Sequence, residues 1–201
     1  MELLEKETRE FGYQTRLFTR FAFFKENQNQ GFKSHREAVL GYLTYHNRLW
    51  ECDIWSLDIF MRTGENVSPE AFEEKFQQTS DKLVYSNSRS FEDVQGWPVR
   101  VNIALMKAKE MESKKFFVKN GTYETAFLDE RAAAPKTKAE FIQINEQLFL
   151  EKDQLEIYCW DTSFTNYYNG GREWWGAYLW TVYDRKRSRF TVISINLVNQ
   201  A

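Results

Sequence analysis

The sequence contains few of the residues that break secondary structure or that build metal sites. Its 201 residues include 9 glycines, 3 prolines, 2 cysteines and 2 histidines. Average usage would give roughly 14 glycines and 10 prolines in a chain of this length, so we expect long elements joined by short connections. A site of three histidines cannot form within one copy of the chain.

Export signals and membrane-spanning runs are also missing. Residues 1–10 are charged and mixed, without the apolar core of a secretory signal. No apolar run approaches the roughly 18 residues that cross a bilayer. We therefore expect a soluble cytoplasmic protein without membrane contact, in which Cys52 and Cys159 stay reduced.

A large charge of one sign is missing as well. Lys and Arg number 27 and Asp and Glu 29, so the formal net charge is -2. Nucleic-acid binding depends on a basic surface, and a nucleic-acid partner is therefore not expected. The hydrophobic content of 42% and the small net charge exclude a disordered chain. A chain of this size buries enough surface to fold without a disulfide or a metal.

Signature motifs of several enzyme classes are absent too. The sequence has no GxGxxG, no GxxxxGKS/T, no HExxH and no GxSxG. These absences argue against dinucleotide-binding, phosphate-loop, zinc-protease and serine-hydrolase classes. We expect no cofactor and no metal, assign no catalytic residue and favour a protein without enzymatic activity. No motif identifies a known family.

The first 114 residues are predicted to be mainly helical. Apolar residues three or four positions apart predict a helix over 2–26, with a strand over 15–24 as the alternative. A second apolar stripe keeps one face over many turns and predicts a long helix over 35–62. This stripe consists of Val39, Leu43, His46, Trp50, Ile54, Leu57 and Met61.

Capping residues set the expected ends of two of these helices. Ser34 and Glu37 fit a capping box at the start of the long helix, and Gly64 fits the left-handed residue that ends it. Ser68 followed by Pro69 opens the next helix, which we expect to end near residue 85.

The middle of the chain changes pattern. Residues 86–96 have loop composition, and Pro98 is expected to start a helix that reaches about residue 113. Asn120-Gly121 is a strong signal for a two-residue turn, so 115–128 is predicted to be a β-hairpin.

Strands dominate the predicted C-terminal part. After a loop over 129–136, Thr137 and Glu140 fit a capping box that opens one further helix. Alternating patterns then predict strands over 155–160, 174–183 and 190–198.

These elements predict an α+β fold. About four N-terminal helices and one later helix are expected to pack on a C-terminal antiparallel sheet of about five strands. We expect a single compact domain over 1–201, with a helical part over 1–114 and a mainly β part over 115–201.

Aromatic residues gather in the segment 158–183. The predicted strand 174–183 carries them on both faces, whereas a strand with one solvated face would alternate with polar residues. Two interpretations are open: helices cover both faces, or one face binds a partner. The candidate binding residues of this segment are Trp160, Asp161, Trp174, Trp175 and Tyr178.

His46 and Arg187 are the other candidate binding residues. His46 lies on the apolar stripe, where it is either a buried, hydrogen-bonded residue or part of a site. Arg187 lies among basic residues at a hairpin tip, which forms either an ordinary solvated turn or an anion contact beside stacking aromatics.

Three functions compete on this evidence. The first is a non-enzymatic protein that binds a protein partner through the aromatic sheet face or the long helix. The alternative is a small-ligand binder or enzyme with a pocket between helix and sheet, using Trp160, Trp175 or His46. The third is a single-strand nucleic-acid binder that uses Trp174, Tyr178 and the basic turn. An exposed aromatic patch without a cavity would favour the first, and a closed apolar pocket of roughly 300–1,000 Å³ with His46 or Asp161 pointing into it would favour the second.

Overall fold

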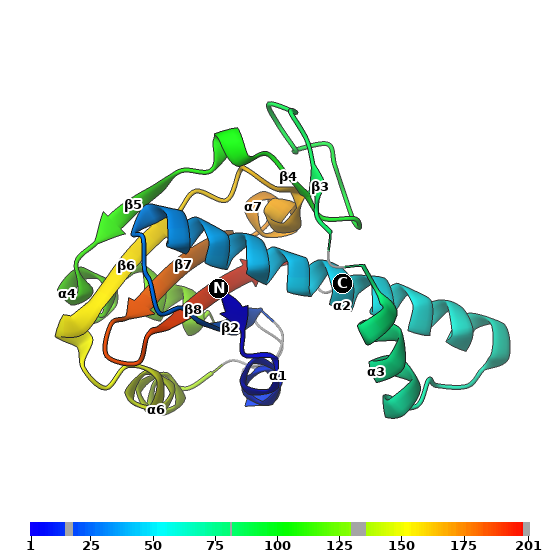
Figure 1. Ribbon diagram of the computed structural model, residues 1–201, viewed down its shortest axis with the longest axis horizontal. Coiled ribbons are helices and arrows are strands. Elements are labelled where there is room, and N and C mark those ends of the chain that lie inside the picture. Colours follow the sequence, from blue (N-terminus) through cyan, green and yellow to red (C-terminus); the bar gives the residue numbers. More distant parts are fainter. Residues whose placement is uncertain (15–17, 81, 130–135, 199–201) are drawn as a thin grey trace.

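The computed structural model is an α+β fold built around one antiparallel sheet (Figure 1). It describes residues 1–14, 18–80, 82–129 and 136–198. Within these residues the main sheet contains, in spatial order, β1 (Glu2–Leu3), β2 (Thr19–Lys25), β8 (Arg189–Leu197), β7 (Gly176–Asp184), β6 (Leu155–Trp160) and β5 (Ala108–Met111). A separate parallel pair joins β3 (Val84–Tyr85) and β4 (Arg100–Val101).

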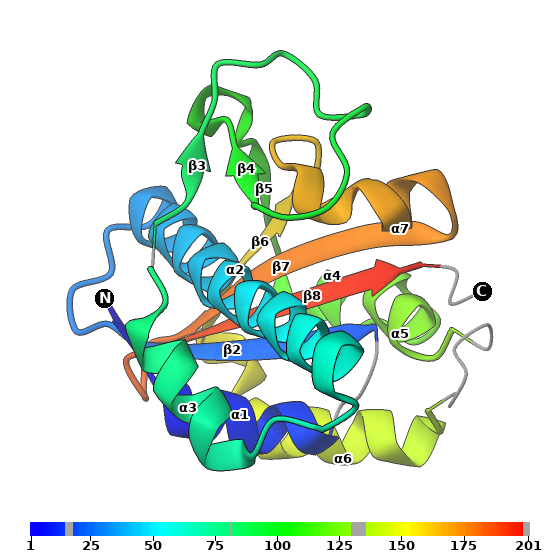
Figure 2. The ribbon, with the colours of Figure 1, turned by 90° about the vertical axis from the view of Figure 1, so that its right-hand side faces the viewer.

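Helices cover both faces of the sheet (Figure 2). One face carries the long helix α2 (Phe32–Thr63) and the short α7 (Asn169–Glu173). The other face carries α1 (Glu5–Gln14), α4 (Ser113–Phe116), α5 (Thr122–Phe127) and α6 (Lys138–Leu148). Helix α3 (Pro69–Gln78) packs on α2, and the 3₁₀ turns are η1 (Ile103–Leu105), η2 (Lys152–Gln154) and η3 (Asn166–Tyr168).

Successive residues of β7 face two different hydrophobic cores. Leu179 and Tyr183 belong to the core beneath α2, whereas Trp180 and Val182 belong to the opposite core. A sheet covered on both faces needs apolar side chains on both, so the aromatic residues of 174–183 need no solvated face. Of the two interpretations of this strand, the structure shows the first: helices cover both faces of the sheet.

The first half of α2 packs tightly against the sheet. Val39, Tyr42 and Leu43 are fully buried in the core beneath this helix. Gly41 lies directly over the ring of Phe24, and a Cβ at this position would stand 2.7 Å from the ring. The absence of a side chain at Gly41 therefore lets α2 approach the sheet more closely than another residue would allow.

The opposite core explains much of the aromatic content of the chain. Phe116 stacks on Tyr123 with ring centroids 4.5 Å apart, and both rings meet Trp180 edge-on at 5.8 and 5.5 Å. Edge-on and offset contacts of this kind add stability beyond the burial of area. Phe rings from α1 and β2 complete this side.

The second half of α2 extends beyond the sheet (Figure 1). Ile54, Leu57, Phe60 and Met61 are exposed there, with 59% of Leu57 and 75% of Met61 accessible to solvent. The predicted stripe is thus buried only as far as the sheet reaches, because periodicity reports which face a residue lies on and not whether anything covers it.

Several predicted helix ends are confirmed. Gly64 ends α2 in the left-handed conformation, and the Ser68 hydroxyl accepts a hydrogen bond from the Ala71 N–H at the start of α3. Thr137 and Glu140 form the predicted capping box. The box at Ser34 was wrong: α2 begins at Phe32, three residues before the predicted start, and the Ser34 hydroxyl accepts a hydrogen bond from the Gln30 N–H instead.

Other predicted elements were wrong. The segment 98–113 holds β4, η1 and β5 instead of a helix, and 115–128 holds α4 and α5 instead of a hairpin. In the latter, Asn120 takes positive φ but Gly121 does not, so the turn leads into a helix. Helix α3 ends at Gln78, short of residue 85.

The N-terminal segment 2–26 divides into three elements. Here the alternative strand is confirmed over Thr19–Lys25, while a helix occupies only Glu5–Gln14. Leu17, and most of the predicted loop 129–136, lie outside the described residues.

Substitution of two leucines on α2 tests the contrast between its halves. We expect Leu43→Ala to lower the free energy of unfolding by about 2–5 kcal/mol, because it opens a cavity in the core. Leu57→Ala, on the exposed half, should change it by no more than about 0.5 kcal/mol. Urea-induced unfolding followed by circular dichroism measures both. Equal losses would contradict the placement of Leu57.

Candidate functional site

A cavity of about 660 Å³ lies where α2 leaves the sheet, and we call it the His46 pocket. In Figure 2 this region lies between the second half of α2, α7 and the adjoining ends of β2 and β8. The volume falls within the range of about 300–1,000 Å³ that is usual for small-ligand sites. Side chains of α2, β2, β8, η3 and the loop at 95–96 line it.

The floor of the pocket forms where two neighbouring strands change from apolar to polar residues. On the face beneath α2, β8 presents in order Phe190, Val192, Ser194 and Asn196, and β2 presents Phe24, Ala22 and Arg20. Arg20 and Ser194 are register partners, so the change occurs at the same level on both strands. The core ends there and the pocket begins.

One face of α2 forms the wall opposite. His46, Leu49, Trp50 and Asp53 all line the pocket, at spacings of three and four residues that bring side chains to one side of a helix. Trp50 and Leu49 supply apolar surface, and Asp53 supplies a carboxylate. Burial raises the pKa of Asp53, against the opposing charge of Arg20.

His46 is a buried polar group of the pocket, with 7% of the residue exposed. Its ring packs on Tyr42 at 4.4 Å between centroids, and its Nε2 makes no hydrogen bond with any described residue. Burial, and then the positive charge of Arg20, lower the pKa of His46 well below its usual value. The ring is therefore neutral at pH 7. Buried polar atoms normally have partners, and Nε2, although shielded from solvent, is a polar atom of the pocket wall that lacks one.

Arg20 supplies a positive charge to the pocket, and the residue is exposed to solvent. It forms no hydrogen bond or ion pair with the described residues, although Asp53 lines the same pocket. A guanidinium carries five N–H donors and stays charged at any physiological pH. An open arginine in a hollow surface suits an anionic oxygen group.

Tyrosine hydroxyls lie behind these groups. The hydroxyls of Tyr42 and Tyr167 are 3.0 Å apart, and those of Tyr168 and Ser194 are also 3.0 Å apart. Burial raises the pKa of Tyr42 and Tyr168 well above 10. These hydroxyls therefore remain protonated, and they add hydrogen-bonding capacity without adding charge.

Two asparagines hold the rim of the pocket in place. The Asn166 amide donates to the Gly96 carbonyl at 2.8 Å and accepts from the Arg100 N–H at 2.7 Å. Asn47, on α2, accepts from the Val99 N–H at 2.7 Å. The loop before β4 is thereby fixed to both η3 and α2, so the rim does not depend on a ligand for its shape.

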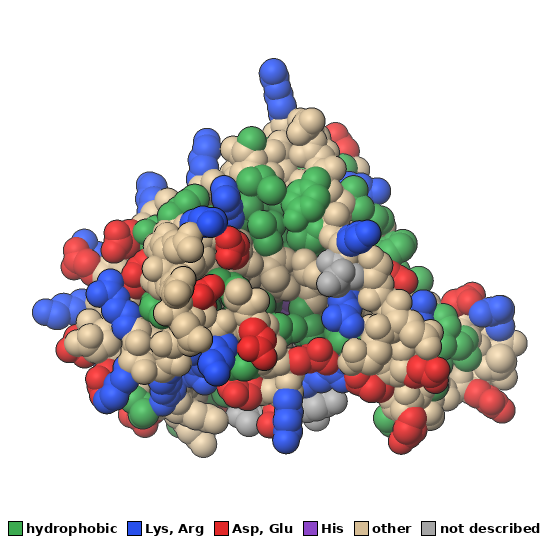
Figure 3. Space-filling model, viewed as in Figure 1, with side chains coloured by type: hydrophobic (Ala, Val, Ile, Leu, Met, Phe, Trp, Pro, Cys, Tyr) green, Lys and Arg blue, Asp and Glu red, His purple; other side chains and the backbone are tan. Residues whose placement is uncertain are grey.

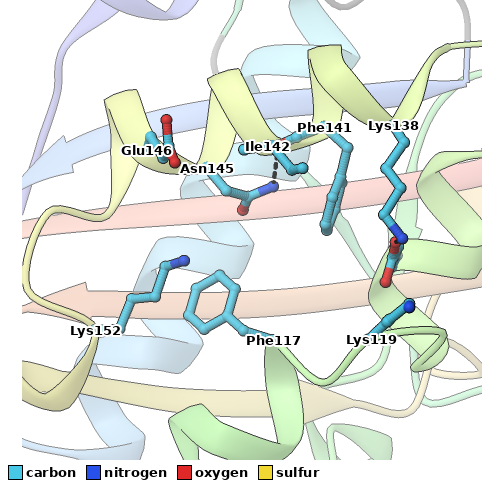
Figure 4. Close-up of a pocket in the computed structure, with 9 residues that line it drawn as sticks. Phe117, Lys119, Lys138, Phe141, Ile142, Asn145, Glu146 and Lys152 are labelled. Carbon is cyan, nitrogen blue, oxygen red and sulfur yellow. Dashed lines mark hydrogen bonds and ion pairs between the residues drawn. The ribbon is translucent and has the colours of Figure 1, made fainter.

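A smaller hollow of about 360 Å³ lies between α6 and α4, on the far face of the sheet (Figure 4). Lys119, Lys138 and Lys152 surround it, and Phe117 and Phe141 line it. Lys138 forms an ion pair of 3.0 Å with the buried Glu124, and Lys152 lies over the Phe117 ring. Because these groups engage one another, this hollow offers less to a ligand than the His46 pocket does.

Trp160 and Asp161 occupy structural positions. Trp160 is 4% exposed, and its indole N–H donates to the Thr181 hydroxyl at 2.9 Å. Asp161 follows β6 and accepts a hydrogen bond from the Ser163 N–H at 2.7 Å. Partial burial tends to raise the pKa of Asp161, but the hydrogen bonds from Ser163 outweigh it, so the pKa is lowered. Neither residue lines the His46 pocket.

The aromatic candidates near β7 do not form one surface. Trp174 is 54% exposed at the end of α7, whereas Trp175 is half-buried against the core opposite α2. Tyr178 is half-buried on that same side and stacks on Trp180 at 5.7 Å. Trp160 belongs to the other core, so the sheet separates it from Trp175.

Arg187 and its basic neighbours have partners. The Arg187 guanidinium donates to the Leu148 carbonyl at 3.0 Å. Arg185 forms an ion pair with Glu156 at 3.2 Å, and Lys186 forms one with Glu151. On the molecular face in Figure 3, basic and acidic side chains are interspersed. The basic turn is thus partly neutralised in the structure.

His46 is the one candidate residue that the structure places in this pocket, and the sequence did not reveal its companions. Arg20 was hidden because its strand was read first as part of a helix. Ser194 and Asn196 did carry a signal, since a polar pair following Phe190 and Val192 at a period of two marks the point where a core ends.

Within residues 1–14, 18–80, 82–129 and 136–198, no group of three or more His, Cys, Asp or Glu side chains could hold a metal ion. No helix in these ranges is long and apolar enough to cross a bilayer. Both cysteines are free thiols.

Comparison with protein-family models, with curated proteins and with solved structures gives no match for this chain.

The second histidine, His35, is also buried and neutral. Its Nδ1 lies 2.7 Å from the Thr181 hydroxyl, and no part of the residue is exposed. Burial lowers the pKa of His35 to about 3, although Glu156 lies 3.3 Å from Nε2. This carboxylate is shared with Asn29 and Arg185, which weakens its hold on a proton at His35.

Both histidines should make the fold sensitive to acid. In the unfolded chain a histidine takes up its proton near pH 6.5, whereas folded His35 does so at about pH 3. The unfolded state binds more protons between these values, so the free energy of unfolding should fall as the pH falls through this window. The slope is at most about 1.4 kcal/mol per pH unit for each histidine.

The variant His46→Gln isolates one of these contributions. Carboxylates with a lowered pKa, such as Glu124, give the same sign of pH dependence, so only the difference between wild type and variant is decisive. Urea unfolding at several pH values below 6.5 should show a shallower slope for His46→Gln. Parallel slopes would mean that His46 is protonated in the folded protein.

Proposed function

We propose that the protein binds a small organic anion in the His46 pocket and acts by binding rather than by catalysis. The observation that carries this proposal is the meeting of two groups in one cavity. The solvent-exposed Arg20 guanidinium has no hydrogen bond or ion pair with the described residues, and the buried Nε2 of His46 has no hydrogen-bond partner. The neutral His46 ring can donate one hydrogen bond from Nε2 while Arg20 neutralises the charge of the same ligand group.

The walls of the pocket suit a ligand that also has an apolar body. Trp50, Leu49 and Phe18 line it together with the polar groups. Ligand sites commonly combine such apolar walls with a few polar groups that fix orientation. Carboxylates and phosphate esters share the anionic oxygens that Arg20 recognises, and both classes are candidates.

Binding of a protein through the aromatic sheet face has less support. Helices cover both faces of the sheet, and the aromatic residues of β7 are divided between two cores. Nucleic-acid binding by the basic turn has less support as well, because its side chains have acidic or carbonyl partners.

Calorimetric titration with matched probes tests the proposal. Phenylacetate and phenyl phosphate carry the anion, and phenylacetamide is the neutral analogue of the first. We expect at least one anion to bind and the amide to bind about tenfold or more weakly. Arg20→Gln should weaken the anion by a similar factor, since a hydrogen bond to a charged group contributes about 1.5–3 kcal/mol.

Arg89→Gln is the matched control for this substitution. Arg89 is exposed and lies outside the pocket, so its loss should leave affinity within about twofold of wild type. If neither anion binds, or if Arg20→Gln and Arg89→Gln have equal effects, the proposed function is wrong.

A further inference from the structure

We propose that the anion is the C-terminal carboxylate of a cationic, apolar segment of another protein, which lies along the exposed half of α2. This inference rests on the proposed function, because it assigns the occupant of the same pocket. The structural basis is that the pocket and the exposed apolar residues share one face of one helix.

The spacing along α2 shows this continuity. His46, Trp50, Asp53, Leu57 and Phe60 follow one another at gaps of 4, 3, 4 and 3 residues. Such gaps keep side chains on one side of a helix. The first three line the pocket, and the last two are exposed beyond it. Ile54 and Met61 widen the exposed part, which we call the apolar stripe (Ile54, Leu57, Phe60 and Met61).

The size of the apolar stripe exceeds what scattered surface residues require. All four of its side chains are at least 44% exposed, and they come from two successive turns of one helix. Single exposed apolar residues are ordinary, but a contiguous group marks a contact surface. Helix α3 packs beside this half of α2 through Phe72 and Phe76 and leaves the apolar stripe uncovered.

The charge around the apolar stripe selects the partner. Between residues 51 and 75 the chain carries seven acidic and two basic residues. Glu51, Asp58 and Glu73 form ion pairs with Lys75, Arg62 and Arg9, and the region keeps an excess of negative charge. Among these acids, Glu51, Asp53 and Asp58 lie on α2 itself. Complementary charge favours a segment that carries lysine or arginine beside its apolar side chains. Arg20, at the inner end, has the opposite sign and suits an anion there.

The position of Arg20 selects a chain end rather than an acidic side chain. The sheet forms the floor of the pocket, and the loop at 95–96 and η3 contribute to its lining. Beyond His46 the buried Tyr42 and Leu43 fill the space between α2 and the sheet. A chain that arrives along α2 meets the sheet and must stop or turn back. A terminal carboxylate allows it to stop. The path from Met61 to His46 is about 22 Å at 1.5 Å per residue, which about seven extended residues cover.

Selection from synthetic peptides tests the inference. The probes are random peptides of about twelve residues with free C-terminal carboxylates, and the same library with amidated ends. We expect the selected peptides to combine basic and apolar residues and to lose about tenfold or more in affinity on amidation. Their binding should weaken as salt is raised, because the stripe is flanked by acids.

Three variants of the protein divide the contributions. Arg20→Gln and Leu57→Glu should each weaken the selected peptides about tenfold or more. Ile142→Glu, at an exposed position on α6, places the same change outside the proposed surface and should have an effect below about twofold. Leu57→Glu should leave phenylacetate or phenyl phosphate binding intact, because Leu57 does not line the pocket.

The outcomes separate this inference from the proposed function. Three results would contradict the peptide partner: no peptide is selected, the amidated peptides bind equally well, or Leu57→Glu has no effect on peptide binding. If small anions still require Arg20 in any of these cases, the proposed anion pocket stands. If the small anions are also indifferent to Arg20→Gln, both are wrong.

Discussion

The fold depends on how closely the first half of α2 packs across the sheet. Val39, Tyr42 and Leu43 fill one core against Phe24 and Leu179. Because α2 is longer than the sheet is wide, the same contact leaves a helical end without a core. The His46 pocket forms at the boundary, where the sheet residues turn polar and the helix continues.

Much of the architecture follows from local patterns in the sequence. The α+β class, the long helix, the strands of the C-terminal meander and the cap at Thr137 could be predicted, because each depends on residues close together in the chain. The wrong predictions concern segments whose secondary structure depends on contacts with residues far away in the sequence. Thr19–Lys25 becomes a strand because β8 offers a neighbour, and the short segments around 98–128 take shape against the sheet.

The site was less predictable for the same reason. His46 could be singled out from its position on an apolar stripe, but its environment comes from β2 and β8, which lie more than twenty and more than a hundred residues away. Aromatic content pointed instead to 158–183, where the rings divide between two cores. Composition identifies the segments that are rich in apolar residues, and only the tertiary structure decides which of those residues stay exposed to a partner.

Gly41 has a consequence that reaches well beyond its own contact. A methyl group there would press on the buried Phe24 ring, so either the ring would shift within the core or the helix would tilt. If α2 tilts as a rigid body about Gly41, the displacement grows with distance along its axis. A tilt of a few degrees at the pivot displaces a point about 30 Å along a helix by one to two ångströms. One hydrogen atom in place of a methyl group thus sets the direction in which the far end of the molecule points.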